Sequence, residues 1–179
     1  MRGIPTYRRS RAEGFSLLEL VVVLTLLMVM TMMVMPVFKG ALSEAKVEQS
    51  MLDMHAMIKN ARSLAMSEGN EYRIYVNPKE NRYWIGRWSG LNKKGERVFT
   101  PAPGIRDPIV QLPSSVKLMR PNKADFDRKR KEYYVTFYPS GVCSPSPTEI
   151  LVNVGGDRRK QYKIKLDGLS IDFKEPGQR

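Results

Sequence analysis

Cysteine and histidine are almost absent from this chain of 179 residues, which contains one of each, Cys143 and His55. A single cysteine excludes an internal disulfide. One histidine, far along the chain from that cysteine, provides no ligand set for a metal ion. No base, nucleophile or ligand cluster lies at a spacing suited to catalysis. The sequence therefore predicts a protein that is not an enzyme and that has no cofactor or metal site.

Charge is absent from residues 20–38, where Thr25 and Thr31 are the only polar side chains. Together with Leu17 and Leu18, this run reaches the roughly 20 residues that a helix needs to cross a bilayer. It is too long for the apolar core of a secretory signal, which spans about 7–15 residues, and no small-residue cleavage site follows it. The run therefore predicts a transmembrane helix that the mature protein retains.

The flanks of this run predict its orientation. Residues 1–14 contain four arginines and one glutamate, whereas residues 39–48 contain two lysines and two glutamates. The positive-inside rule places the more basic flank in the cytoplasm. We therefore expect a cytoplasmic N-terminus and an exported C-terminal domain.

Glu19 is the one acidic residue within the apolar stretch 14–38. On insertion scales a carboxylate costs roughly 2.5–3.5 kcal/mol at the centre of a transmembrane helix, and less near an interface. An ionisable group in this position indicates a function and needs a partner. The alternative interpretation is that Glu19 lies at the membrane surface and reaches water.

The sequence GFSLLE, from Gly14 to Glu19, follows a basic leader and precedes an apolar helix. It resembles the prepilin signal of type IV pilins and type II secretion pseudopilins. The resemblance implies cleavage between Gly14 and Phe15 by a prepilin peptidase, N-methylation of Phe15, and retention of the helix for assembly. Pro36 falls where this family often carries a proline that kinks the helix.

The resemblance also implies a partner for Glu19. Cleavage would create an ammonium group on Phe15, and in a filament the Glu19 carboxylate of one subunit would meet the ammonium of its neighbour. Opposite charges near 4 Å attract by about 4 kcal/mol at an effective dielectric constant of 20. This attraction offsets much of the cost of burying the carboxylate, so the pair would favour assembly in a defined register.

A second helical pattern follows the apolar run. Between Ser43 and Glu68, apolar residues recur at spacings of four and three, which is typical of one buried helix face: Val47, Met51, Met54, Ile58, Ala61 and Ala65. Gly69 predicts the end of this helix. Because proline lacks an N–H group and clashes with the preceding turn, we expect a kink at Pro36.

After Gly69 the apolar period changes from 3.6 to 2, which predicts strands. The alternating segments are 72–76, 133–137, 150–154, 162–166 and 169–173, and a turn at 77–81 leads from the first of them into 82–88. Asp167-Gly168 predicts a two-residue hairpin between the last two. Short connections imply antiparallel pairing, so we expect an α+β, type IV pilin-like fold with one long N-terminal helix packed on an antiparallel sheet.

These patterns predict four segments. Residues 1–14 form a leader that is removed, 15–38 a transmembrane assembly helix, 39–69 its amphipathic continuation, and 70–179 a periplasmic β domain. The stretch 89–131 is rich in glycine and proline, which predicts a loop-rich insertion. It either contacts a neighbouring subunit or cargo, or is a floppy insertion without a role.

Two C-terminal segments, Phe137–Gly141 and Tyr162–Gly168, resemble the H-type pseudopilins and the FimT-like minor pilins. Asn60–Ala65 resembles the helix end of the same group. The resemblance implies a minor pseudopilin that supports protein export as a structural subunit of a type II secretion pseudopilus. Its partners would be other pseudopilins, the prepilin peptidase and the inner-membrane assembly platform. It would lie in the bacterial inner membrane and then in the pseudopilus.

Net charge keeps a second function open. The chain carries +12, and removal of the leader leaves 26 basic and 17 acidic residues, a net charge of +9. Basic runs attract nucleic acid, and two occur here: Arg128, Lys129, Arg130 and Lys131, and Arg158, Arg159 and Lys160. The alternative function is therefore a FimT-like minor pilin that binds DNA during uptake. Interleaved acids and a C-terminus without an arginine-rich end favour a solvated basic surface instead.

Overall fold

The computed structural model describes residues 16–105, 107–155 and 157–177, without the side chains of 33–44 and 157–159. The chain divides into two compact units, residues 1–42 and 43–179. One helix, α1 (Leu17–Glu68), passes through both. Pro36 lies within this continuous helix, but its side chain is outside the described part, so the kink at Pro36 stays a prediction.

Within the described part of residues 70–177, eleven strands form two antiparallel sheets. Sheet A contains β1 (Tyr72–Asn77), β2 (Arg82–Leu91), β3 (Arg97–Pro101), β4 (Ile109–Gln111), β6 (Asp125–Asp127), β7 (Glu132–Phe137) and β8 (Cys143–Ser144). Sheet B contains β5 (Val116–Leu118), β9 (Thr148–Val154), β10 (Asp157–Asp167) and β11 (Ser170–Lys174). The order is β3-β2-β1-β7-β6 in sheet A, with β4 on β2 and β8 on β7, and β11-β10-β9-β5 in sheet B. The α+β prediction is confirmed, with two sheets in place of one.

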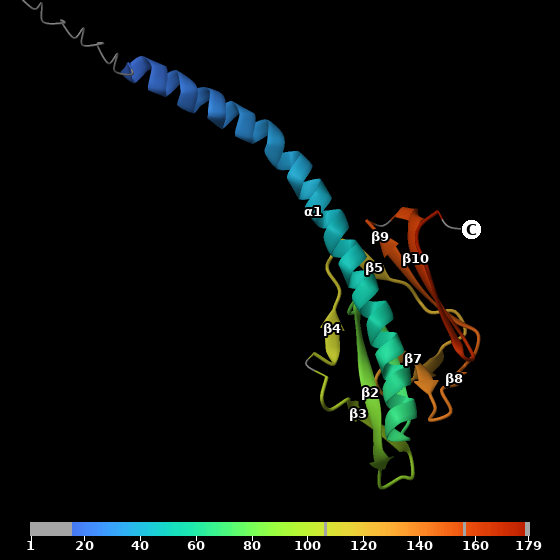
Figure 1. Cartoon of the computed structure of the whole chain (residues 1–179). Coiled ribbons are helices and arrows are strands. Elements are labelled where there is room, and N and C mark those ends of the chain that lie inside the picture. The colour runs from blue at the N-terminus through green and yellow to red at the C-terminus, as the bar shows by residue number, and fades with distance from the viewer. Residues whose placement is uncertain (1–15, 106, 156, 178–179) are drawn as a thin grey trace, which may run out of the picture. The chain divides into compact units, whose positions relative to one another are not determined.

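The core of this unit forms where the C-terminal half of α1 lies across the strands (Figure 1). All six residues of the predicted helix stripe, from Val47 to Ala65, are at most 3% exposed. Alternate residues of both sheets cover them, among them Ile74 and Ile85 of sheet A and Ile150 and Ile164 of sheet B. Full burial of a large apolar side chain contributes roughly 1.5–3 kcal/mol, so this contact dominates the stability of the unit.

The hairpin between β10 and β11 lies one residue later than predicted. Asp167 pairs with Ser170, so Gly168 and Leu169 form the two-residue turn. Gly168 has φ of +55°, which suits such a turn. Leu169 was expected to be a strand residue but is 60% exposed. The reason is the register: Leu166 is buried and pairs with Ile171, which leaves only two residues for the turn.

The stretch 89–131, which is rich in glycine and proline, contains several short strands. It contains β3, β4, β5 and β6 as well as the end of β2, and it adds buried residues to the core: Phe99, Ala102, Leu112, Val116 and Leu118. Most residues of the stretch still lie outside strands, so the short strands alternate with loops. Each of these four strands has only three to five residues, too few for a clear period-2 pattern.

Sheet A also carries an aromatic cluster on the face opposite α1. Tyr75 and Trp84 are cross-strand partners whose rings stack with centroids 4.2 Å apart, and Phe99 packs beside them. All three are at most 3% exposed. Gly86 makes room for them, because a Cβ atom there would lie 2.9 Å from Tyr75 Cε2 and 3.1 Å from Trp84 Cζ3. The sheet therefore has a packed core on both faces.

This packing predicts that Gly86→Ala destabilises the protein. An added methyl group must displace rigid rings, and overpacking of this kind costs about 1–3 kcal/mol. Urea denaturation of the full chain in detergent, followed by tryptophan fluorescence, measures the free energy of unfolding. Lys117→Ala, at an exposed position of β5, is the control and should change stability by about 0.5 kcal/mol or less. Equal stability of the two variants would contradict the packing role of Gly86.

Candidate assembly site

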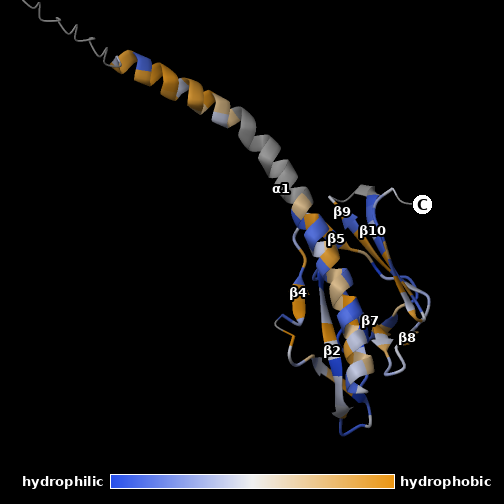
Figure 2. Cartoon of the chain, in the orientation of Figure 1, coloured by the Kyte–Doolittle hydropathy of each residue, from blue (hydrophilic) through white to orange (hydrophobic). Residues whose placement is uncertain are grey.

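The N-terminal part of α1 presents an apolar surface on all sides. Every leucine, valine and methionine in residues 17–32 is between 46% and 80% exposed, and Figure 2 shows this segment as almost uniformly hydrophobic. A helix that is apolar all round requires burial among other helices or in lipid. In the described part of the chain, no helix meets the combined length and hydropathy of a membrane-crossing segment.

The two threonines of this segment do not interrupt its apolar surface. Thr25 Oγ1 donates to the carbonyl oxygens of Val21 and Val22 at 3.0 and 2.8 Å, and Thr31 Oγ1 donates to the carbonyl of Leu27 at 2.7 Å. Such bonds to the preceding turn satisfy a hydroxyl group within its own helix. Glu19 is therefore left as the polar side chain of residues 17–32 that needs an external partner.

Glu19 lies in the first turn of α1 and is exposed. The positive end of a helix dipole stabilises an acid there by about 0.3–1 kcal/mol, less than the cost of burying a carboxylate in lipid. Among the described residues, no basic side chain forms an ion pair with Glu19. Gly14 and Phe15 lie outside the described residues, so cleavage between them and methylation of Phe15 stay predictions.

The first basic run forms the tight turn between β6 and β7. The N–H of Lys131 donates to the Asp127 carbonyl at 2.7 Å. Asp127 Oδ1 accepts the backbone N–H groups of Lys129 and Arg130 at 2.9 and 3.1 Å. The Lys129 ammonium pairs with Glu96, in the turn between β2 and β3. Part of the charge in this run is therefore already neutralised within the domain.

Arg130 has a structural contact as well. Its guanidinium lies 5.0 Å from the centroid of the Trp84 ring and 5.7 Å from that of Tyr75. Its Nη2 donates to the carbonyl of Phe99 at 2.8 Å. Arg130 thus covers the aromatic cluster of sheet A, a role that the sequence run of four cations conceals.

The acid next to this run, Glu132, is buried to 2% exposure. It accepts hydrogen bonds from Trp84 Nε1 at 2.9 Å, Arg82 Nη2 at 3.0 Å and Asn77 Nδ2 at 3.3 Å. Three donors satisfy a carboxylate that would otherwise be costly to bury. Glu132 therefore fixes β7 to β1 and β2 beside the aromatic cluster.

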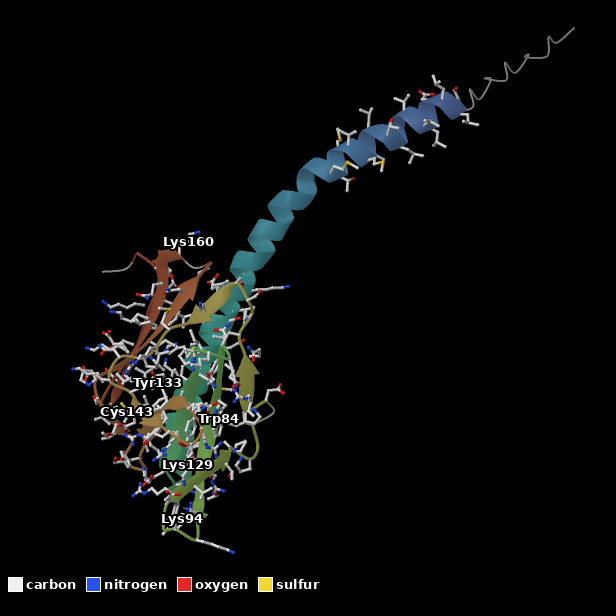
Figure 3. The ribbon with its side chains drawn as sticks, turned by 180° about the vertical axis from the view of Figure 1, so that it is seen from behind. Trp84, Lys94, Lys129, Tyr133, Cys143 and Lys160 are labelled. Carbon is white, nitrogen blue, oxygen red and sulfur yellow. The ribbon has the colours of Figure 1, made fainter. Side chains whose placement is uncertain are left out.

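The second basic run lies elsewhere. Lys160 lies at one end of the β domain, whereas Lys94 and Lys129 lie toward the other (Figure 3). The side chains of Arg158 and Arg159 are outside the described part. On β10, Lys163 and Lys165 are two residues apart and therefore share one face of the strand. Lys163 Nζ lies 3.5 Å from Glu149 and Lys165 Nζ lies 3.1 Å from Asp167. The described members of the two runs therefore do not form one surface.

The lone histidine and the lone cysteine are structural residues. His55 stacks on Phe173 with ring centroids 5.2 Å apart. Burial lowers the pKa of His55, the nearby charge of Lys59 lowers it further, and a hydrogen bond to the Ile171 backbone opposes this. Cys143 is a buried free cysteine, and burial raises the pKa of its thiol. Neither environment is that of a reactive group.

Comparison with known proteins supports the sequence resemblance at the N-terminus. Residues 9–35 match the family described as "Prokaryotic N-terminal methylation motif", which confirms the predicted prepilin motif. This segment includes Gly14, Phe15 and Glu19. No curated protein matches the chain.

Solved structures share the fold. The minor pseudopilin EpsH from the type II secretion system of Vibrio cholerae is 11% identical and has a TM-score of 0.57, over 75% of this chain and 97% of that chain. The type IV minor pilin FimU of Pseudomonas aeruginosa is 15% identical and has a TM-score of 0.51, over 75% of this chain and 92% of that chain. The pilin-like α+β fold is thereby confirmed.

The contacts of Arg130 predict that one residue of the basic run supports the fold. Arg130→Ala should lower the free energy of unfolding by about 1–2 kcal/mol, because it removes cation–π contacts and a charged hydrogen bond to Phe99. Arg128→Ala removes the same charge from an exposed position of the same turn and should cost about 0.5 kcal/mol or less. Chemical denaturation of the two variants measures the difference. Equal stability would show that Arg130 is only a surface charge.

Proposed function

We propose that this chain is a minor pseudopilin, a structural subunit of a type II secretion pseudopilus that supports protein export. The observation that carries the proposal is the described helix within the methylation motif, which is apolar on every side and has Glu19 as its unsatisfied polar group. The unit formed by residues 43–179 buries its own core. The exposed apolar residues of 17–32 are therefore available for contacts with other molecules.

In this proposal the N-terminal helix anchors the precursor in the bacterial inner membrane, with the leader in the cytoplasm and residues 39–179 in the periplasm. Prepilin peptidase cleaves between Gly14 and Phe15 and methylates Phe15. The helix of the mature subunit then leaves lipid for a bundle formed by the helices of other pseudopilins, on an inner-membrane assembly platform. The subunit itself carries out no chemistry.

An ion pair would favour the assembled state over the isolated subunit in the membrane. Before assembly each Glu19 carries the penalty of a carboxylate close to lipid. In the bundle, the ammonium of a neighbouring Phe15 approaches this carboxylate, and attraction of about 4 kcal/mol at an effective dielectric constant of 20 offsets that penalty. Because the pair forms only at one axial offset between subunits, it also selects the register.

The likeness to EpsH supports a secretion role for the folded domain. The alignment extends over almost all of EpsH and has the higher TM-score of the two comparisons. The alternative of a DNA-binding minor pilin depends on a joint basic surface. Lys129 and Arg130 already contact Glu96 and Phe99, and Lys160 lies far from both (Figure 3), so no observation on the described residues favours it.

The proposal predicts that Glu19→Ala separates processing from assembly. The variant should be inserted and cleaved normally, because the residues at the cut are unchanged. Its incorporation into filaments should fall by about tenfold or more, since loss of about 1.4 kcal/mol already gives a factor of ten. Immunoblots of membrane and sheared-filament fractions measure both quantities.

Glu48→Ala is the matched control, because Glu48 is an exposed acid further along the same helix. It should be cleaved and incorporated like the unaltered chain. If Glu19→Ala enters filaments as well as Glu48→Ala does, the pairing with the Phe15 ammonium is refuted.

A further inference from the structure

A groove of about 520 Å³ opens between the exposed side of α1 and the segment that leads into β4. It lies entirely within the unit formed by residues 43–179 and is separate from the N-terminal assembly helix. Its lining includes Asp53, Met57, Tyr83, Ile105, Asp107 and Ile109. The groove thus combines apolar walls with two carboxylates and one phenol.

The two carboxylates of the groove are both exposed and come from distant parts of the chain. Asp53 Oδ1 accepts a hydrogen bond from Gln49 Nε2 at 2.7 Å. Among the described residues, no basic side chain forms an ion pair with Asp53 or with Asp107. Two acids that face one cavity in a chain of net charge +12 make it a site for a cation.

Tyr83 provides an independent sign that a polar group is missing. The residue is fully buried, yet its hydroxyl has no hydrogen-bond partner among the described residues. Burial raises the pKa of Tyr83, and the nearby Asp53 charge raises it further, so the hydroxyl stays protonated. A buried hydroxyl without a hydrogen-bond partner destabilises the folded state. A donor or acceptor brought by another molecule would remove that destabilisation.

We infer that the groove receives a lysine or arginine side chain, flanked by apolar residues, from a neighbouring subunit of the filament. The alkyl stem of such a side chain packs on Met57 and Ile105, while its cationic end reaches Asp53 and Asp107. A small shift of the groove wall that uncovers the buried Tyr83 hydroxyl gives the N–H groups of this side chain a further acceptor. The identity of the partner as a neighbouring subunit depends on the proposed function, but the cation chemistry of the groove does not.

Two features favour a protein segment over a free cation. Ile109, on the rim, is 48% exposed, which gives a partner an apolar surface beside the charge. In addition, β4 pairs only with β2 among the described strands. The N–H and C=O groups of its other edge are therefore free to form hydrogen bonds with an extended chain. Edge strands of this kind are where peptides add to a sheet.

The inference is tested with a peptide probe and the full chain in detergent micelles, labelled with ¹³C at isoleucine δ1 methyl groups. The probe is acetyl-Ile-Lys-Ile-amide, and the same peptide with norleucine in place of lysine removes only the charge. The lysine peptide should shift the signals of Ile105 and Ile109 but not that of Ile171, which lines another pocket. Equal binding of the norleucine peptide, or no shift at Ile105 and Ile109, overturns the cation site.

Variants identify the groups that bind. Asp53→Asn together with Asp107→Asn should weaken the lysine peptide about tenfold, equivalent to about 1.4 kcal/mol. Asp125→Asn together with Glu175→Gln makes the same change in net charge at exposed positions elsewhere and should leave the affinity unchanged. Tyr83→Phe should weaken binding about two- to tenfold, the effect of one hydrogen bond. Unchanged affinity in the Asp53/Asp107 variant contradicts the inference.

Filament incorporation then tests the partner separately from the proposed function. The Asp53/Asp107 variant should be cleaved normally but incorporate less than the Asp125/Glu175 control. Normal incorporation despite weak peptide binding would refute a neighbouring subunit as the occupant. Glu19→Ala should bind the peptide with unchanged affinity. If Glu19→Ala incorporates normally, the proposed function fails, and the peptide titration still decides the chemistry of the groove.

Discussion

The removal of the apolar surface of α1 from water is the constraint on which the structure depends. In residues 43–68 this surface is one stripe, and two sheets cover it, so the unit is stable through its own contacts. In residues 17–32 the surface is apolar on every side and no described residue covers it. This N-terminal part of α1 can therefore be buried only by lipid or by other helices. Because lipid already removes it from water, the hydrophobic effect alone does not favour a helix bundle over the membrane.

Polar groups in the protein follow a related rule, because each one that loses water needs a partner. Glu132 obtains three donors inside the sheet, and Arg130 obtains a carbonyl and two aromatic rings. Glu19 and Tyr83 obtain none from the described residues. The satisfied groups hold the domain together, whereas the unsatisfied ones are the groups for which we propose contacts with another subunit. Part of the positive charge of the chain, at Lys129 and Arg130, is engaged in contacts within the domain.

The sequence predicted what depends on local periodicity and short motifs. The stripe from Val47 to Ala65 and the alternation on β1, β7, β9 and β10 were correct, because a period of 3.6 or 2 follows directly from burial on one face. The turn at Gly168 was misplaced by one residue, since its position depends on pairing across the hairpin. The aromatic cluster around Gly86 and the groove between Asp53 and Asp107 were missed. Both unite residues from separate strands or from the helix and a strand, which no local pattern reveals.

We propose that cleavage before Phe15 converts a membrane precursor into an assembling subunit, because it frees the ammonium that pairs with Glu19 of a neighbouring subunit. Intact-mass spectrometry of the polypeptide extracted from membranes tests this most directly. The account predicts a chain that begins at Phe15 and carries one added methyl group. A chain that retains Met1, or one trimmed at any other residue, would contradict it.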